Sequence, residues 1–340
     1  MTNDSISATN TMRILLSSDH EYPAANPNGS GLHPKKFPSG SGYVLHDLLA
    51  KGLAELGHDV FYLVRRSHAE APRGVNLIYE PVSEVDILHT ISGRDATLIE
   101  ESRKPWVATC HMDERTRGRK RDAATPNWIY VSRTLAQLHE SDRYVWNGID
   151  PQEYVYNETK DDYFLFMSTM DWGTQKGLDT VLSLAKRVGF KLVVAGTGES
   201  YERIEKVQEM CREVGAKYVG DVRGQKKAEL LAGAKGFLFP TKLDEAFGLG
   251  MIEALMSGTP VICSDRGACP EIITSEVGFV CSSEDQYITA LERIGRIDPR
   301  TCRNKALRDY HYHVMATNYV REYEIECART GSDRAHAAAQ

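Results

Sequence analysis

The stretch TKLDEAFGLGMIEALMSGTPVICSD, from Thr241 to Asp265, decides the fold of this chain. It holds two carboxylates, Glu245 and Glu253, on either side of the small-residue turn Phe247–Gly250. An apolar segment follows the turn, and Pro260–Cys263 predicts a buried strand. A glycine-containing turn that opens a helix presents unpaired backbone N–H groups and the positive end of the helix dipole, which suits a phosphate.

The two glutamates bracket this anion site, one before the turn and one inside the helix. A phosphate flanked by carboxylates that bind hydroxyl groups describes a sugar nucleotide, and this is the first hypothesis for the ligand. The plainer alternative is that Glu245 and Glu253 lie on a solvated face, as most glutamates do.

Composition sets the class of the protein. At 340 residues, with 41% hydrophobic and 26% charged residues, the chain is globular and long enough for two domains. The net charge of -6 argues against a dedicated nucleic-acid binder. Seven scattered cysteines, no export signal and no long apolar run predict a cytoplasmic protein with reduced thiols. Peripheral attachment at the inner membrane face stays open.

Short apolar runs alternate with helical or polar segments through the first half of the chain. The helix predicted at Tyr43–Leu56 lies between strands at Met12–Ser18 and Asp59–Val64, which makes a βαβ unit with a parallel sheet. Further strands are expected at Asp86–Ile91, Trp106–His111, Asn127–Ser132 and Arg143–Asn147.

A second series follows the turn Asn147–Pro151 and the acidic linker Glu158–Asp162. Helices are expected at Leu178–Val188 and Tyr201–Val214, and the tail from about Arg300 to Arg329 is helical in pattern. The strands are expected at Tyr163–Met167, Lys191–Gly196, Lys217–Gly220, Gly236–Pro240 and Gly278–Cys281. The sequence therefore predicts an α/β fold with two doubly wound, Rossmann-like domains, whose ligands bind at the carboxyl edges of the strands.

Glu245-x7-Glu253 resembles the motif of the retaining glycosyltransferases of family 4. The resemblance covers nearly the whole chain and includes Lys176-Gly177, Ser41-Gly42, Gly57–Val60 and Asn147–Asp150. It implies the GT-B fold, in which two such domains face a central cleft. It also implies an acceptor-side domain at 1–155, a nucleotide-sugar-binding domain at 156–312, and a C-terminal helix at 313–330 that crosses back to the first domain.

The resemblance assigns roles on the donor side. Glu253 would accept hydrogen bonds from the donor ribose, and Glu245 would hold the hydroxyls of the transferred sugar. Lys176 resembles the lysine that stabilises the charge of the leaving diphosphate, although a surface lysine is the plainer reading. The backbone N–H groups of the turn would contact the diphosphate, and its residues are Phe247, Gly248, Leu249 and Gly250.

One departure from the family pattern concerns an arginine expected five or six residues before the lysine. Those positions hold Asp171 and Met170. Either another cation takes the place of the arginine or the diphosphate is held less firmly.

Candidates on the acceptor side are fewer. The loop Gly40-Ser41-Gly42 precedes a helix and would approach a phosphate of the donor, or the acceptor, through its backbone. His111 ends a strand at the expected cleft, where the family often places a histidine near the donor sugar and the acceptor; an isolated histidine is otherwise more often structural. The basic run Arg115–Arg121 is either a solvated loop or a surface for an anionic acceptor or membrane.

Other chemistries find little support. No Asp-x-Asp pair occurs, so no metal is expected to hold the diphosphate, and no cofactor is expected. Gly196-Thr197-Gly198 lacks the third glycine of a dinucleotide fingerprint, and there is neither a Walker loop nor a Gly-x-Ser-x-Gly elbow.

The favoured function is a metal-independent, retaining transfer of a sugar, most simply from a UDP-sugar, to a hydroxyl of a glycan, a lipid-linked sugar or a small molecule. Because no clear enzymatic nucleophile is present, attack on the same face as the leaving diphosphate is preferred over a covalent intermediate. The alternatives are a non-catalytic nucleotide-sugar-binding subunit and a sugar-nucleotide epimerase of the same fold.

Overall fold

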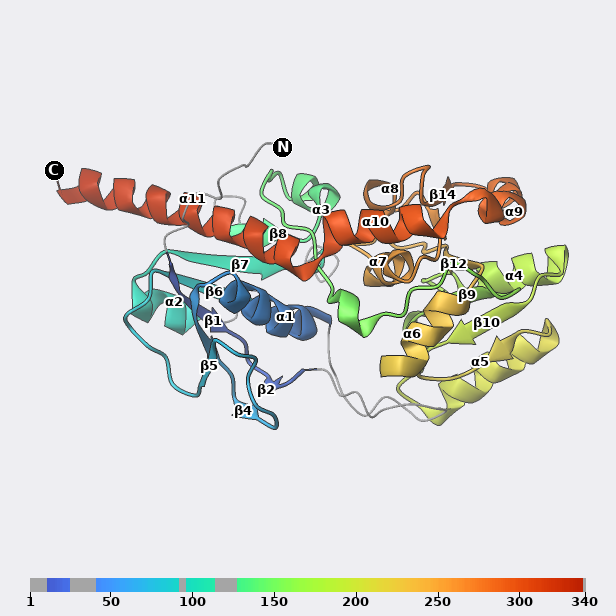
Figure 1. Cartoon of the computed structure of the whole chain (residues 1–340), viewed down its shortest axis with the longest axis horizontal. Coiled ribbons are helices and arrows are strands. Elements are labelled where there is room, and N and C mark those ends of the chain that lie inside the picture. The colour runs from blue at the N-terminus through green and yellow to red at the C-terminus, as the bar shows by residue number, and fades with distance from the viewer. Residues whose placement is uncertain (1–10, 25–40, 92–95, 114–126, 339–340) are drawn as a thin grey trace.

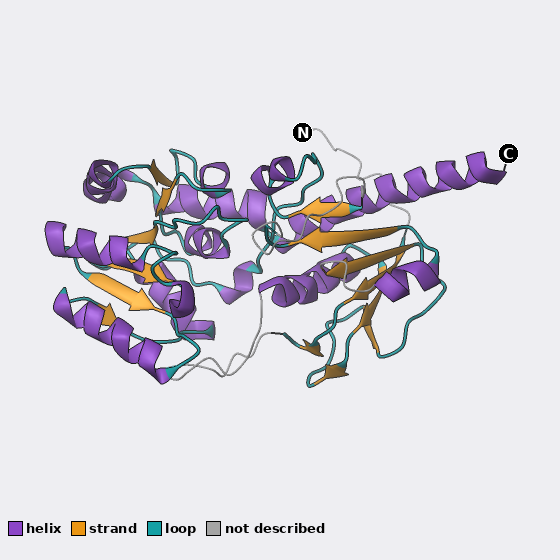
Figure 2. Ribbon diagram, turned by 180° about the vertical axis from the view of Figure 1, so that it is seen from behind, coloured by secondary structure: helices purple, strands orange, loops and turns teal. Residues whose placement is uncertain are grey.

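Two lobes, each built on a six-stranded parallel sheet, lie side by side in the computed structural model (Figures 1 and 2). The structure describes residues 11–24, 41–91, 96–113 and 127–338. We call the lobe that holds β1 to β8 the first unit and the lobe that holds β9 to β14 the second unit.

The sheet of the first unit has the strand order β5-β3-β1-β6-β7-β8, with every pairing parallel. Its helices are α1 (Ser41–Glu55), α2 (Ala96–Ser102) and α3 (Arg133–Leu138), and β2 (Glu21–Tyr22) pairs with β4 (Arg66–Ser67) beside the sheet. The strands of the sheet are β1 (Arg13–Ser17), β3 (Asp59–Leu63), β5 (Val75–Ile78), β6 (Ile87–Ile91), β7 (Trp106–Cys110) and β8 (Trp128–Tyr130).

The sheet of the second unit repeats this order as β11-β10-β9-β12-β13-β14. Its strands are β9 (Phe164–Met167), β10 (Leu192–Ala195), β11 (Lys217–Tyr218), β12 (Gly236–Phe239), β13 (Val261–Ser264) and β14 (Gly278–Cys281). Its helices are α4 (Leu178–Val188), α5 (Tyr201–Glu213), α6 (Gly224–Gly233), α7 (Leu249–Met256), α8 (Cys269–Ile272), α9 (Glu284–Arg293) and α10 (Pro299–Tyr310). The single-turn helices η2 (Pro151–Glu153), η3 (Met170–Trp172) and η4 (Ile294–Arg296) complete the described elements after β8, apart from the last helix.

In both sheets the strand order reverses between the first and the fourth strand, when the six strands of each sheet are counted in chain order. The order 3-2-1-4-5-6 places a topological switch point between β1 and β6 in the first unit and between β9 and β12 in the second. Ligands of such sheets bind at the carboxyl ends of the strands beside this point.

Alternating side chains of the strands pack against different layers. In β1, Ile14 and Leu16 belong to the core cluster that contains α1, whereas Leu15 faces the opposite cluster, against which Leu98 and Ile99 of α2 pack. β1 is therefore buried on both faces, as a continuous apolar run in a parallel sheet predicts.

The last helix, α11 (Tyr312–Ala338), leaves the second unit and lies along α1 of the first (Figure 1). The side chains that it contributes to the core of the first unit recur at helical spacing: Tyr312, Met315, Ala316, Tyr319, Val320 and Tyr323. The chain thus completes the core of its first half with residues from its end.

The two connections between the units lie against each other. The amide of Ile149 donates to the carbonyl of Tyr310 (2.9 Å), and the amide of Tyr312 donates to the carbonyl of Ile149 (3.1 Å). A Cβ atom on Gly148 would lie 2.7 Å from the Cα of Tyr312, so this close crossing requires glycine. The break between α10 and α11 falls at the same place.

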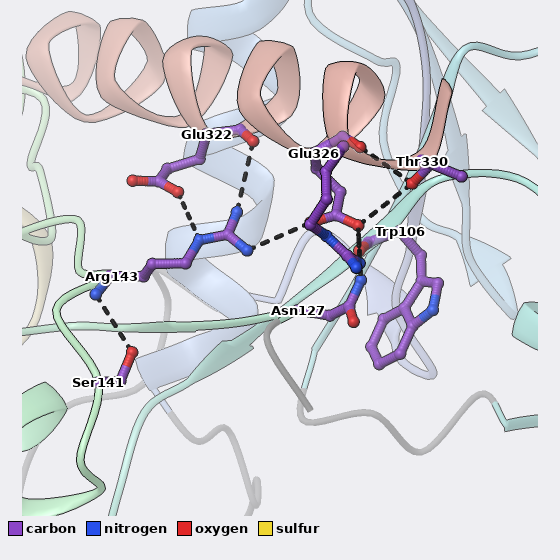
Figure 3. Close-up of polar contacts among 8 residues, drawn as sticks. Trp106, Asn127, Ser141, Arg143, Glu322, Glu326 and Thr330 are labelled. Atoms are coloured by element: carbon purple, nitrogen blue, oxygen red, sulfur yellow. Dashed lines mark hydrogen bonds and ion pairs between the residues drawn. The ribbon is translucent and has the colours of Figure 1, made fainter. Parts of the chain in front are cut away.

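A buried carboxylate anchors α11 to the first unit, as Figure 3 shows. Glu326 is fully buried and accepts hydrogen bonds from Asn127 Nδ2 (2.9 Å) and Arg143 Nη1 (3.2 Å). Arg329 Nη2 lies 2.6 Å from the same carboxylate, and Arg143 Nε also donates to Glu322 (2.8 Å). The charge of the carboxylate is therefore matched by arginines from two parts of the chain.

The structure differs from the sequence predictions at several places. The run Arg143–Asn147 forms only an isolated bridge between Tyr130 and Tyr144, because its side chains contact α11 and α8 instead. The helical pattern of the tail is interrupted at His311: α10 ends at Tyr310, and α11 runs from Tyr312 to Ala338. The strand β5 was not predicted. The residue ranges given for the domains remain a prediction.

No helix within the described ranges is both long and apolar enough to cross a membrane.

Replacing Glu326 with alanine should lower the free energy of unfolding by about 3 kcal/mol, because Arg143 then loses a buried partner. Urea unfolding at neutral pH measures the change. The control is Glu324→Ala on the exposed side of the same helix, which should change stability by less than about 0.5 kcal/mol. Equal losses in the two variants would contradict the anchoring role of Glu326.

Candidate functional site

A pocket of about 280 Å³ opens at the carboxyl edge of the second sheet. Loops that follow β9 and β10 line it, together with the end of β12, so the pocket lies at the switch point of this sheet. Its lining includes Ser168, Thr197, Phe239, Gly250 and Glu253. The pocket is where a doubly wound sheet is expected to hold its ligand.

The start of α7 faces this pocket through Gly250. Gly248 precedes the helix with φ of 92°, a left-handed conformation that glycine adopts readily, and no side chain caps the helix start. The first N–H groups of an α-helix lack partners within the helix. Uncapped, they provide the donors for an anion that the sequence predicted at Phe247–Gly250.

Lys176 and Glu245 form an ion pair at the edge of the site. Lys176 Nζ donates to Glu245 Oε2, and both side chains are largely buried. Gly177 follows with φ of +92°, and a Cβ atom there would lie 2.2 Å from the carbonyl oxygen of Pro240. This glycine lets the chain pass close to the end of β12 and places the lysine beside the carboxylate.

A loop that the sequence did not single out encloses the backbone of Glu245. The amide of Ala268 donates to the carbonyl of Glu245 (2.8 Å). Gly267 has φ of +54°, and a Cβ atom there would lie 2.2 Å from the amide nitrogen of Glu245. The position of Glu245 therefore depends on the segment that leads into α8.

Glu253 has two partners on one oxygen. Its Oε1 accepts hydrogen bonds from Lys227 Nζ (2.7 Å) and from the hydroxyl of Tyr154 (2.9 Å). Burial, together with the nearby charge of Glu253, raises the pKa of Tyr154 well above its usual value, so its hydroxyl stays protonated and donates. Within the described part of the chain, Oε2 of Glu253 has no partner. Sequence reasoning missed Lys227 and Tyr154, since neither belongs to a motif.

The positions where the family pattern has an arginine carry no cation. Met170 is buried in the core of the second unit. Asp171 accepts hydrogen bonds from the amide of Glu199 (3.0 Å) and from Thr169 (3.3 Å), so it braces the loop after β10 that lines the pocket. One of the two positions expected to carry the arginine thus holds Asp171, a carboxylate that fixes the loop beside the pocket.

His111 lies directly after β7 in the first unit, with its ring against the start of α1. A Cβ atom on Gly42 would lie 2.9 Å from His111 Cδ2, so the structure brings these two predicted residues together. Burial lowers the pKa of His111 to about 4, which leaves the ring neutral at pH 7. No hydrogen bond or ion pair among the described residues joins His111 to Lys176 or Glu245. Gly40, the side chain of Ser41 and Arg115–Arg121 lie outside the described residues.

Two further histidines lie behind His111. The rings of His46 in α1 and His89 in β6 are 4.9 Å apart between centroids, and both are buried. His89 is hydrogen-bonded to the hydroxyls of Tyr323 in α11 and Thr109 in β7, each at 2.7 Å. Burial lowers the pKa of His89 to about 3 and that of His46 well below its usual value.

No group of three or more His, Cys, Asp or Glu side chains in the described ranges is placed to hold a metal ion. All seven cysteines are free thiols, and six of them are buried.

Comparison with known proteins finds similarity to glycosyltransferases. Residues 152–301 match the family model described as glycosyl transferases group 1. The chain is 27% identical over 281 residues to D-rhamnosyltransferase WbpZ of Pseudomonas aeruginosa. The aligned region covers 73% of this chain and 70% of that protein. It is 25% identical over 181 residues to a phosphatidyl-myo-inositol mannosyltransferase of Mycobacterium leprae, covering 49% of this chain and 47% of that protein.

Solved structures share the fold. AviGT4, a glycosyltransferase of avilamycin A biosynthesis, has a TM-score of 0.72 at 23% identity, over 93% of this chain and 98% of that one. Anabaena HepE, solved with UDP and glucose, has a TM-score of 0.65 at 12% identity, over 92% and 99%. These likenesses confirm the GT-B fold. The family model and the relatives support a glycosyltransferase.

The buried histidines predict acid sensitivity. In the unfolded chain they bind protons below about pH 6.5, whereas the folded protein holds their pKa values far lower. The unfolded state therefore binds more protons between about pH 6.5 and 4, and stability falls as the pH falls. Each histidine should contribute a slope of about 1.4 kcal/mol per pH unit there.

Urea unfolding from pH 7.5 to 5 measures this slope. His111→Asn should make the slope shallower. If wild type and His111→Asn had the same slope, the pKa of His111 would be the same in the folded and the unfolded protein, which would contradict the prediction.

Proposed function

We propose that the protein is a retaining glycosyltransferase that moves a sugar from a nucleoside diphosphate sugar to an acceptor hydroxyl without a metal ion. The observation that carries the proposal is the ion pair of Lys176 and Glu245 beside the uncapped start of α7. A cation, a sugar-binding carboxylate and free N–H groups converge there at the carboxyl edge of one sheet.

Binding of the donor exchanges partners at this site. The diphosphate takes the N–H groups at the start of α7 and attracts Lys176 away from Glu245. Glu245 is then free to accept hydrogen bonds from the hydroxyls of the transferred sugar. Lys176 stabilises the negative charge that grows on the leaving phosphate, and a fixed cation does this most strongly in the transition state.

Glu253 supports the nucleoside. Lys227 and Tyr154 hold its Oε1, which orients the carboxylate and leaves Oε2 for the hydroxyls of the ribose. The carboxylate lines the 280 Å³ pocket, so a nucleoside in the pocket lies within its reach. UDP is the preferred nucleotide because HepE, a structure of the same fold, was solved with UDP and with UDP-glucose.

The acceptor approaches from the first unit, where His111 and Gly42 lie together. A neutral His111 accepts or donates one hydrogen bond and orients the attacking hydroxyl or a hydroxyl of the sugar. Attack on the face that the diphosphate leaves lets a phosphate oxygen take the proton of the acceptor. The acceptor is a hydroxyl of a glycan, a lipid-linked sugar or a small molecule.

Release of nucleotide from a panel of UDP- and GDP-sugars, with and without EDTA, tests the function. Slow hydrolysis of at least one donor should persist in EDTA. Glu245→Ala and Lys176→Ala should each lower this rate by about 100-fold, the usual loss when one electrostatic contact to a transition state is removed. Asp244→Ala, an exposed carboxylate beside Glu245, is the matched control and should keep the wild-type rate.

The outcomes separate the alternatives. Tight nucleotide-sugar binding without turnover, even with candidate acceptors, would favour a binding subunit. Conversion of the donor into its epimer would show the epimerase. Loss of activity in EDTA that Mg²⁺ restores, or a covalent sugar trapped on Glu245, would overturn the metal-independent, same-face mechanism.

A further inference from the structure

We propose that Glu271, on α8 of the second unit, is a positioning residue that fixes the first unit against the donor-binding turn. Its effect on the reaction rests on the function proposed above, whereas its effect on the arrangement of the two units does not.

The carboxylate of Glu271 receives four hydrogen bonds from the chain before the interdomain connection. The amide of Arg133 donates to Oε1 (2.8 Å), and the amide and hydroxyl of Thr134 both donate to Oε2 (2.9 Å each). Trp146 Nε1 donates to Oε1. Partners 125 to 138 residues away in sequence thus meet on one side chain.

These donors fit a carboxylate and no other common side chain. An ionised carboxylate has only acceptor positions, with room for about four donors. A glutamine would turn an NH₂ group toward one pair of the donors and lose their bonds. Hydrogen bonds to a charged acceptor are also about twice as strong as neutral ones. The contact is therefore specific for Glu271 in its charged form.

One route leads from Glu271 to the sugar-binding carboxylate. Glu271 lies three residues beyond Ala268, whose amide bonds to the carbonyl of Glu245 (2.8 Å). Gly267 packs directly on the backbone of Glu245, with no room for a side chain. A shift of α8 relative to the first unit therefore moves Glu245.

A second route leads to the diphosphate-binding turn. The ring of Trp146 packs on Tyr310 with centroids 5.6 Å apart, and Tyr310 packs edge-on against Phe247 at 6.0 Å. Phe247 belongs to the turn before α7. Trp146 thus touches both the Glu271 carboxylate and the aromatic stack that supports the turn.

Both routes start at the segment that follows β8, and β8 neighbours β7, the strand directly before His111. The donor groups lie in the second unit, while His111 and Gly42 lie in the first. Transfer requires the reacting atoms to be aligned closely, and a misplacement of about 1 Å can cost about 100-fold in rate. By holding the two units together, Glu271 aligns the two halves of the site.

Hydrogen exchange tests the contact without any ligand. In Glu271→Gln, the NH₂ group takes the place of one acceptor oxygen, so either the amide of Arg133 or that of Thr134 should exchange at least about tenfold faster than in wild type. Small-angle scattering of Glu271→Ala should show a larger radius of gyration. Glu276→Ala, an exposed glutamate beyond α8, is the matched control and should match wild type in both measurements.

Kinetics test the positioning role. With UDP-glucose, or the donor of the panel that wild type hydrolyses, Glu271→Gln should lower kcat by about tenfold or more while KM changes by less than about threefold. Rates are normalised to folded protein, so a loss of stability alone does not produce this split. Glu276→Ala, the exposed glutamate beyond α8, should keep the wild-type kcat.

The proposal would be overturned if Glu271→Gln had the amide exchange rates and the kcat of wild type. It would also be overturned if Glu271→Gln lost donor binding and kcat to the same extent. If wild type neither binds nor hydrolyses any donor, the proposed function fails, while exchange and scattering still decide whether Glu271 holds the units together.

Discussion

The donor side depends on two carboxylates that are each neutralised by a lysine. Glu245 pairs with Lys176 and Glu253 pairs with Lys227, and all four side chains are largely buried. A buried charge is costly without a partner, so these pairs let acidic groups stay at the edge of the sheet before any ligand arrives. Lys176 lies just before α4 and Lys227 lies in α6, so the placement of both segments is part of the same electrostatic balance. In the function proposed above, a polyanionic ligand competes for the lysines and releases the carboxylates for neutral hydroxyls.

The sequence was most informative where a signal is local. Strands such as Leu192–Ala195 and Val261–Ser264 are continuous apolar runs, so the fold was predictable, and the small-residue turn before α7 let an anion site be proposed from a local signal. Tyr154 and Glu271 were not, because their partners lie 99 to 138 residues away and no pattern links them. Arg143–Asn147 contains a short apolar run like those of the strands, yet its side chains bind elements that the run does not reveal.

The acceptor side follows a different physical plan from the donor side. It uses uncharged polar groups, with His111 kept neutral by burial and His46 and His89 packed behind it. The bond from His89 to Tyr323 joins this cluster to α11, whereas Glu326 fixes the far part of the same helix through arginines. A charged donor half and a neutral acceptor half suit the proposed reaction. In it, negative charge grows on the leaving phosphate, while the acceptor hydroxyl, which is uncharged, forms the new glycosidic bond.

The route of α11 has a consequence for how the protein is made. The core of the first unit contains Tyr319 and Tyr323, which leave the ribosome only after the whole second unit has been synthesised. Domains usually fold in the order in which they emerge. Here the strands of the first unit are synthesised early, but part of its apolar surface stays uncovered until α11 emerges. The second unit can therefore complete its fold before the first. Synthesis from the N-terminus and completion of the folded structure therefore run in opposite directions along this chain.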